Sequence, residues 1–297
     1  MKEALSTQHI NDNDIEVTGE LRTNLQSLLL SMFLDVKEVC DKHNIPLFLC
    51  GGSSLGAVRH KGFIPWDDDL DLSMTRTDYN HFQEIFEEEL SDKYYLKAPG
   101  YKAGSRARFP KIMKKDTVFR ERGNPSPESE CGVFLDIFIL DNVPDNKLLR
   151  KIKGVICNGL EFISGQVLLQ EERADKVFED IKKVSKGQYY LRKITGIVFS
   201  FRTVRSWNRS LDKMIQYKKD SEYLALATGR KHYFGEICPR NVFLPGKNGV
   251  FEGHEVRLFS DTDVYLTNLY GDYMEIPEES KREKHFIDEI KLKGANG

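Results

Sequence analysis

The 297-residue chain lacks the features that mark several specialised classes of protein. Its formal net charge is only −2, which excludes the broadly basic surface that coats nucleic acid. It has five cysteines, an odd number, and the closest two are ten residues apart, so zinc-type spacing is excluded. We therefore expect scattered, buried thiols in a reducing compartment.

Signals for targeting or membrane insertion are also scarce. Residues 1–20 are polar and lack an apolar leader, so we expect a flexible N-terminal arm and a cytoplasmic location. The longest apolar stretches, 155–169 and 194–201, are shorter than the ~20 residues of a membrane span or are interrupted by Glu161. No internal repeat or low-complexity tract is present. A composition of 40% hydrophobic and 30% charged residues is instead typical of a globular chain with a large core.

The hydrophobic pattern predicts both helices and strands, and we expect an α+β fold in which helices flank a mixed β-sheet. Apolar residues recur at helical spacing in residues 21–43, 53–60, 77–90 and 263–270. Short apolar or alternating runs predict strands in residues 47–50, 69–74, 94–98, 108–113, 117–120, 131–140 and around 250–258. Gly271 is expected to end the last helix.

Acidic residues follow a glycine-rich turn. Residues 51–53 read Gly-Gly-Ser and precede a predicted helix whose free N–H groups could bind phosphate. Asp69 and Asp71 alternate with apolar residues on the next predicted strand, so both carboxylates project from one face. Asp136 lies in the most apolar strand, where a carboxylate is costly unless it binds a cation or is hydrogen-bonded. Amides beside clustered carboxylates predict a site for a nucleotide bound with Mg²⁺, or with Mn²⁺.

The acidic run has two other interpretations. Taken alone, a run of aspartates is usually a solvated loop. Asp67, Asp69 and Asp71 also have the spacing of the first three ligands of an EF-hand, but that motif fails further on. Its sixth position is Leu72 rather than glycine, and its twelfth is Asp78 rather than glutamate. The glycine turn upstream and the later aspartate together favour the catalytic interpretation.

These residues resemble the LicD family of phosphotransferases, within the nucleotidyltransferase superfamily. The superfamily signature is a Gly-Gly/Ser turn, an Asp-x-Asp pair and a third Asp on a later strand. The run GAVRHKGFIPWDDDLDL (56–72) resembles the family's own motif closely. FLDIFILD (134–141) resembles the strand of the third carboxylate, although Ile139 stands where the family often has Pro. LYGDYMEIPEESKREKH (269–285) resembles the C-terminal motif.

The resemblance implies a nucleotidyltransferase-like fold and transfer of a phospho-alcohol group, typically phosphocholine from CDP-choline, with release of CMP. The implied acceptor is a hydroxyl of a cell-surface glycan, such as teichoic acid or lipopolysaccharide, or of its lipid-linked precursor. The resemblance implies that Asp69, Asp71 and Asp136 are catalytic and hold Mg²⁺. The alternatives are a nucleotidyltransferase that modifies a small molecule and releases pyrophosphate, and a non-catalytic binding protein on the same fold.

Candidates for nucleotide binding are turn-forming, basic and aromatic residues in or near these motifs. We expect them to be Gly51, Gly52, Ser53, Arg59, His60, Lys61, Trp66, Arg108, Lys111, Arg282 and His285. Basic side chains suit contact with a pyrophosphate, and Trp66 could stack on cytosine. The plainer interpretations are a solvated basic turn at 59–61 and a Trp66 that only shapes its loop. In a regular strand Lys111 lies on the face opposite Arg108, unless Pro110 introduces a bulge.

The middle of the chain is basic and amphipathic. Residues 181–219 contain eleven Lys and Arg and one acidic residue, Asp212. We expect this stretch either to contact an anionic membrane surface as a peripheral protein does, or to pack its apolar face on the core. No nucleic-acid partner is expected. The expected organisation is an arm (1–20), a nucleotidyltransferase-like core (21–145), a helical basic insertion (146–230) and a C-terminal part that completes the domain (231–297).

Overall fold

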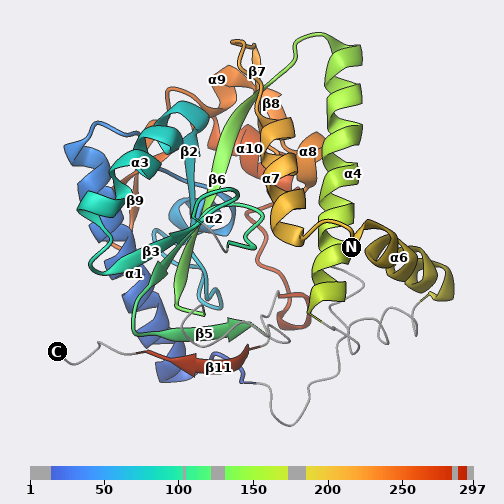
Figure 1. Cartoon of the computed structure of the whole chain (residues 1–297). Helices are drawn as coiled ribbons and strands as arrows, with labels where there is room; N and C mark the ends of the chain where they lie inside the picture. The colour runs from blue at the N-terminus through green and yellow to red at the C-terminus, as the bar shows by residue number, and fades with distance from the viewer. Residues whose placement is uncertain (1–14, 103–104, 122–130, 173–184, 283–286, 293–297) are drawn as a thin grey trace.

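The structure, a computed structural model, describes residues 15–102, 105–121, 131–172, 185–282 and 287–292 (Figure 1). Its strands are β1 (Phe48–Leu49), β2 (Asp71–Thr75), β3 (Tyr94–Lys97), β4 (Lys111–Lys114), β5 (Val118–Glu121), β6 (Phe134–Val143), β7 (Tyr223–Leu226), β8 (Ile237–Pro239), β9 (Lys247–Phe251), β10 (His254–Leu258) and β11 (Ile287–Lys291). Its helices are α1 (Gly19–Lys42), α2 (Gly51–Arg59), α3 (Arg76–Glu89), α4 (Lys147–Glu171), α6 (Lys186–Phe199), α7 (Val204–Ile215), α8 (His232–Gly235), α9 (Arg240–Phe243) and α10 (Thr262–Tyr270), with a 3₁₀ turn at Glu279–Lys281.

Nine of the described strands form one mixed sheet. Its order is β3-β4-β6-β2-β1-β10-β9, and β7 pairs with both β6 and β8. The β2–β6 and β1–β10 pairs are parallel, whereas the remaining neighbours are antiparallel. β5 and β11 pair with each other as a separate ribbon. The fold is α+β with helices around a mixed sheet, which confirms the fold class predicted from the sequence.

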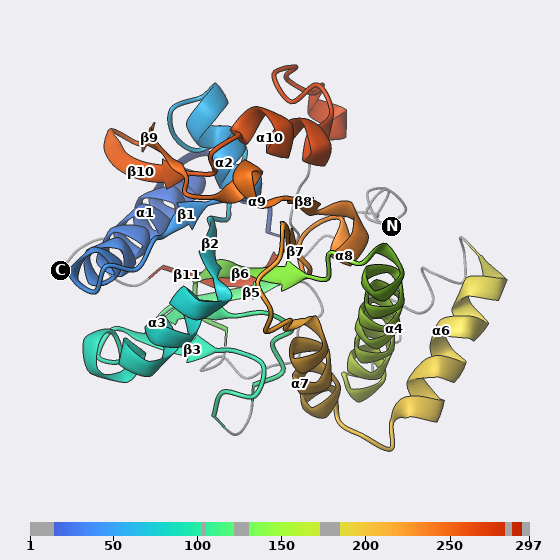
Figure 2. The same ribbon diagram turned by 90° about the horizontal axis from the view of Figure 1, so that it is seen from above.

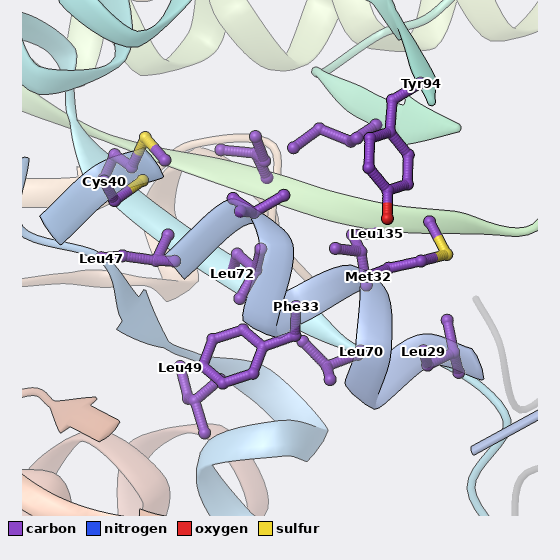
Figure 3. Packing of buried hydrophobic residues seen from close by; sticks show 14 of the residues in the cluster. Leu29, Met32, Phe33, Cys40, Leu47, Leu49, Leu70, Leu72, Tyr94 and Leu135 are labelled. Atoms are coloured by element: carbon purple, nitrogen blue, oxygen red, sulfur yellow. The ribbon is translucent and has the colours of Figure 1, made fainter. Parts of the chain in front are cut away.

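Helices α1 and α3 cover one face of the sheet. Leu72, Leu135 and Ile137 belong to one buried cluster with Met32 and Phe33 of α1 (Figure 3). Because side chains alternate along a strand, the residues between these apolar positions point to the other face. That second face is covered by α2, α9 and α10, which share a further buried cluster with β1 and the later part of β6.

The remaining helices lie at one side of the sheet. Figures 1 and 2 show α4 beside α7, with α6 farthest from the sheet. Side-chain N-caps begin these helices, where Asn146, Ser185 and Thr203 accept a backbone N–H of α4, α6 and α7 respectively. A buried ion-pair network joins this part to the sheet: Arg76 donates to Asp141 of β6 and to Asp212 of α7.

The structure differs from the sequence prediction before, after and within the expected core (21–145). Residues 1–14 lie outside the described part, but the rest of the expected arm is fixed, since Ile15 pairs with Ile287 and Val17 is buried. The stretch 146–230 is not helical throughout, because β7 adds a strand to the main sheet. Asp69 precedes β2 rather than lying in it, and Arg108 precedes β4.

Helix α4 also departs from the prediction, which gave no apolar stretch long enough to cross a membrane. With its basic first turn included, the helix has 25 residues and is, by length and composition alone, a candidate span. About a third of its most apolar window, 33%, is buried against the rest of the chain. All five cysteines are free and buried, as predicted.

Candidate active site

Three strands place Asp71, Asp136 and Lys111 side by side. In the parallel pair of β2 and β6, Asp71 is aligned with Asp136, and in the antiparallel pair of β4 and β6, Lys111 is aligned with the same aspartate. Aligned residues on neighbouring strands share one face of the sheet. Lys111 Nζ lies 3.0 Å from Asp136 Oδ1, so a mostly buried ion pair lies next to Asp71 on the face that α2 covers.

The glycine turn closes over Asp71. Helix α2 begins at Gly51, two residues earlier than predicted, and Gly51 has a φ of 51°, in the left-handed region that favours glycine. A Cβ atom at Gly51 would overlap the Asp71 carboxylate, so only glycine leaves room for it. Gly52 donates its N–H to that carboxylate, and Ser53 Oγ accepts the Asp71 N–H at 2.8 Å. The turn therefore positions Asp71 from both its backbone and its side chain.

Negative charge accumulates around this row. Burial raises the pKa of the Asp71 carboxyl well above its usual range, and the nearby carboxylates of Asp69, Asp136 and Asp67 raise it further. The N–H of Gly52 acts in the opposite direction. A cluster of acidic oxygens that repel one another is a favourable environment for a hard cation such as Mg²⁺.

The arrangement of the carboxylates does not by itself form a closed metal site. Among the residues that the structure describes, no three His, Cys, Asp or Glu side chains converge closely enough to hold an ion as they stand. The donor chemistry nevertheless fits a hard divalent cation, since oxygen ligands are what Mg²⁺ prefers. Assignment of Asp69, Asp71 and Asp136 as metal ligands therefore stays a prediction.

Lys111 is the predicted basic residue that lies next to the aspartates. Although burial acts to lower it, the pKa of Lys111 is raised by the Asp136 carboxylate and, more weakly, by other acidic groups. Its ammonium also lies 3.5 Å from the centre of the Phe134 ring. Arg108, by contrast, pairs with a residue outside the row: its guanidinium lies 2.7 Å from the Glu161 carboxylate of α4. Because β4 starts only at Lys111, the alternation expected between the two residues does not apply.

Three of the predicted binding residues gather around the ring of a fourth, Trp66. The Arg282 guanidinium lies 4.2 Å from the ring centre and that of Arg59 lies 5.9 Å from it. The His60 ring meets Trp66 edge-on at 6.3 Å between centroids. Arg59 also donates to the carbonyl oxygens of Tyr273 and Glu275, at 2.7 and 3.1 Å, which fastens the C-terminal motif to α2. These contacts bring the two distant family-like motifs together.

The two predicted residues not yet placed are Lys61 and His285. Lys61 is exposed in the turn that follows α2, and its carbonyl accepts the Glu252 N–H. His285 lies outside the described residues, so its place in the site stays a prediction.

Sequence reasoning missed Tyr265, which approaches the site from a distant segment, whereas Tyr270 belongs to the C-terminal motif (269–285) that the sequence did indicate. The Tyr265 hydroxyl, on α10, accepts the Gly51 N–H at 3.1 Å and so fixes the turn. Burial raises the pKa of Tyr270 well above its usual range, and Asp71 is the next largest cause, which places this tyrosine near the carboxylates. Tyr265 is 214 residues from Gly51, and no local pattern signals such a contact.

A second polar cluster joins Arg108 to α4 and α8. Glu161, buried in the middle of α4, contacts Arg108 at 2.7 Å and His232 Nδ1 at 2.8 Å. The hydrogen bond to Glu161 raises the pKa of His232, although partial burial opposes the shift. A cavity next to Arg108 is lined by Phe109 and Pro110 before β4 and by residues that follow β7. In the sequence, Glu161 appeared only as an interruption of an apolar run, so its contacts with Arg108 and His232 could not be predicted.

The chain is similar to known proteins over most of its length. Residues 44–139 match the protein-family model described as LicD/FKTN/FKRP, nucleotidyltransferase domain. Over 262 residues, 84% of this chain and 90% of the relative, it is 28% identical to the lipopolysaccharide cholinephosphotransferase LicD of Haemophilus influenzae. Uncharacterised proteins of Rickettsia typhi and Rickettsia prowazekii are 46% and 44% identical over 57 residues, 19% of this chain and 18% and 21% of those relatives. The family match includes the row of Asp71, Lys111 and Asp136.

Proposed function

We propose, from the premise that residues 44–139 of this chain are a LicD-family nucleotidyltransferase domain, that it transfers a phospho-alcohol group to a glycan. The group is phosphocholine from CDP-choline, the acceptor is a hydroxyl of a cell-surface glycan or of its lipid-linked precursor, and CMP is released. Similarity over 84% of the chain to a lipopolysaccharide cholinephosphotransferase supports the phosphocholine and the glycan. The free, buried cysteines fit work in the reducing cytoplasm.

The observation that carries the proposal is the row of Asp71, Asp136 and Lys111 beneath the glycine turn. Asp69, Asp71 and Asp136 would hold Mg²⁺, because burial and mutual repulsion make a cation favourable there. When bound, this ion would neutralise the donor phosphates and the departing CMP. Lys111 adds a fixed positive charge beside Asp136, and Ser53 keeps Asp71 in register with the turn.

The reaction that suits these groups is a direct, in-line displacement. The acceptor hydroxyl oxygen attacks the β-phosphorus of the donor, and the bond from that phosphorus to the bridging oxygen of CMP breaks. CMP departs with the electron pair of that bond, and an aspartate carboxylate of the row takes the hydroxyl proton. Cationic groups around the donor stabilise the charge that develops on CMP.

The test is turnover of the purified chain with Mg²⁺ and each of CDP-choline, CDP-ethanolamine, CDP-ribitol and CTP, with and without a glycan acceptor. We expect acceptor-dependent release of CMP from CDP-choline. Preference for another CDP-alcohol would keep the reaction and change the donor. Pyrophosphate from CTP without CMP release from any CDP-alcohol would contradict the proposal and assign the alternative, a nucleotidyltransferase acting on a small molecule.

A further inference from the structure

Helix α6 presents its apolar face to solvent. Leu191, Ile194, Val198 and Phe201 follow one another at helical spacing along one side of the helix and its C-terminal end. They are 59%, 57%, 57% and 72% exposed. An amphipathic helix of a globular protein normally turns this stripe toward the core. Tyr190 and Ile197 widen the exposed stripe, so it is a continuous feature rather than a single stray side chain.

The opposite side of α6 is already packed, so the stripe is not simply an undocked core face. Tyr189 and Gly196 are buried. The glycine lies so close to α4 that a Cβ there would come 2.8 Å from the Gln166 carbonyl oxygen. Phe199 packs edge-on against Trp207 of α7 at 5.7 Å between ring centroids. The structure therefore holds α6 with its apolar residues outward.

The first half of α4 repeats this arrangement. Its outward apolar residues are 41–68% exposed and are Leu148, Leu149, Ile152, Val155 and Ile156. Both ribbon views place α6 on the side of α4 that faces away from the sheet (Figures 1 and 2). We call the exposed apolar residues of α6, with Phe201, and of the first half of α4 the outer helical surface. Such an extent of exposed apolar side chains marks an interaction surface.

Charge identifies the occupant. Helix α6 carries Lys186, Arg192 and Lys193 and no acidic residue. Before Glu161, α4 has no acidic residue and carries exposed Lys147 and Lys151, whereas Lys153 turns inward and donates to the carbonyls of Met214 and Gln216. The chain as a whole has a net charge of −2, so this positive charge is local. A second copy docked on the same surface would bring like charges together, whereas anionic headgroups would complement them.

We propose that the outer helical surface binds the surface of an anionic phospholipid bilayer, with α6 lying in the interface. Apolar side chains flanked by Lys and Arg are the features by which interfacial helices bind such membranes. The sequence had suggested the wider segment 181–219, but α7 buries Trp207 and Leu211 toward the core and is not part of the surface. The first half of α4, which lies outside the segment 181–219, is part of the surface instead of α7. This binding does not depend on the proposed transferase activity.

Vesicle cosedimentation tests the proposal with the full-length chain. Vesicles of phosphatidylcholine alone are compared with vesicles that also contain phosphatidylglycerol, at low and high salt. We expect binding at least about tenfold stronger to the anionic vesicles, and weaker binding at high salt because the charges are screened. Leu191→Gln combined with Ile194→Gln should lower that binding at least about tenfold, and Lys151→Gln combined with Lys186→Gln should lower it several-fold.

The matched control is Val250→Gln combined with Val264→Gln, which changes two exposed apolar residues elsewhere on the chain and should leave vesicle binding unchanged. Circular dichroism and thermal melting establish that each variant is folded, as expected for changes to exposed side chains. Full binding by the Leu191→Gln, Ile194→Gln variant would overturn the proposal. So would a chain that ignores vesicles but forms dimers that this variant abolishes, because the surface would then bind a second copy.

Discussion

At the scale of single residues, we expect the Asp71 carboxylate to favour the proposed reaction and to disfavour stability. Burial and the carboxylates of Asp69 and Asp136 raise the pKa of Asp71, so its negative charge is unfavourable in the folded chain. We expect Asp71→Asn to leave the free energy of unfolding unchanged or to raise it by about 1 kcal/mol. The same change should lower CMP release by at least about 10²-fold, because the amide cannot balance a cation. Urea unfolding and donor turnover measure the two effects.

The control for this prediction is Asp68→Asn in the same acidic run, which should retain near-normal turnover. Asp136→Asn should lower CMP release as Asp71→Asn does, but unlike that change it should also lower the free energy of unfolding. It leaves the Lys111 ammonium without the carboxylate that lies 3.0 Å away. Near-normal CMP release from either active-site variant would contradict the assignment of the carboxylate row.

Gly51 is a second residue whose identity the site requires. Its φ of 51° disfavours other residues, and a Cβ there would overlap the Asp71 carboxylate. Gly51→Ala should therefore lower the free energy of unfolding by roughly 1–3 kcal/mol and abolish turnover by displacing that carboxylate. Gly159→Ala, on the exposed side of α4 with open space around it, should be neutral or stabilising. Equal effects of the two changes on melting and turnover would refute the explanation.

At the scale of elements, the buried Arg76 network joins α3, β6 and α7. Its guanidinium contacts Asp141 at 2.6 Å and Asp212 at 2.9 Å, and the Asp141 side chain is only 3% exposed. Asp141→Ala would leave a buried cation with one partner fewer, and we expect a loss of about 3–5 kcal/mol in unfolding free energy. Asp41→Ala, in the more exposed pair of Lys37 and Asp41, should change it by less than about 1 kcal/mol. A similar small effect at Asp141 would show that the network is not a structural link.

Elements were predicted well from local patterns, whereas their partners were not. The helix that became α1, the alternating strand that became β2 and the glycine that ends α10 all follow from periodicity and capping, which depend on neighbouring residues. The outward face of α6 was not predictable, because an apolar stripe looks the same whether it is buried or exposed. The apolar stretch 155–169 was judged too short for a membrane span because the apolar residues before it, such as Leu148 and Ile152, alternate with Lys and Arg in the first turns of α4.

The site shows the same division between local and distant information. Asp71 and Asp136 could be paired from the sequence because two apolar strands with embedded aspartates belong in one sheet, and a family-like motif surrounds each. Tyr265 and Glu161 could not be found, since their partners are brought near by topology across 214 and 71 residues respectively. Lys111 was selected for its charge, but its ion pair with Asp136 follows from strand register, which the irregular start of β4 concealed.

At the scale of the whole molecule, Glu236 contributes to the dependence of stability on pH. This glutamate is 2% exposed, and its Oε1 accepts the Lys231 N–H at 2.8 Å. Burial raises the pKa of Glu236 to about 7, although this hydrogen bond and nearby cations oppose the shift. Between its usual pKa of about 4.5 and about 7, the folded state therefore binds more protons than the unfolded state at this position.

It follows that Glu236 lowers the free energy of unfolding as pH rises from about 4.5 to about 7, with no further loss above that range. Glu236→Gln keeps an oxygen for the Lys231 N–H but carries no charge, so it should match the original chain near pH 4.5. Above pH 7 it should be more stable by an amount on the order of 2–3 kcal/mol. Urea unfolding of both chains across this pH range measures the difference, and Glu84→Gln, at an exposed position, should give a constant offset. A constant offset for Glu236→Gln would mean that the buried carboxyl ionises in the folded chain as it does in water.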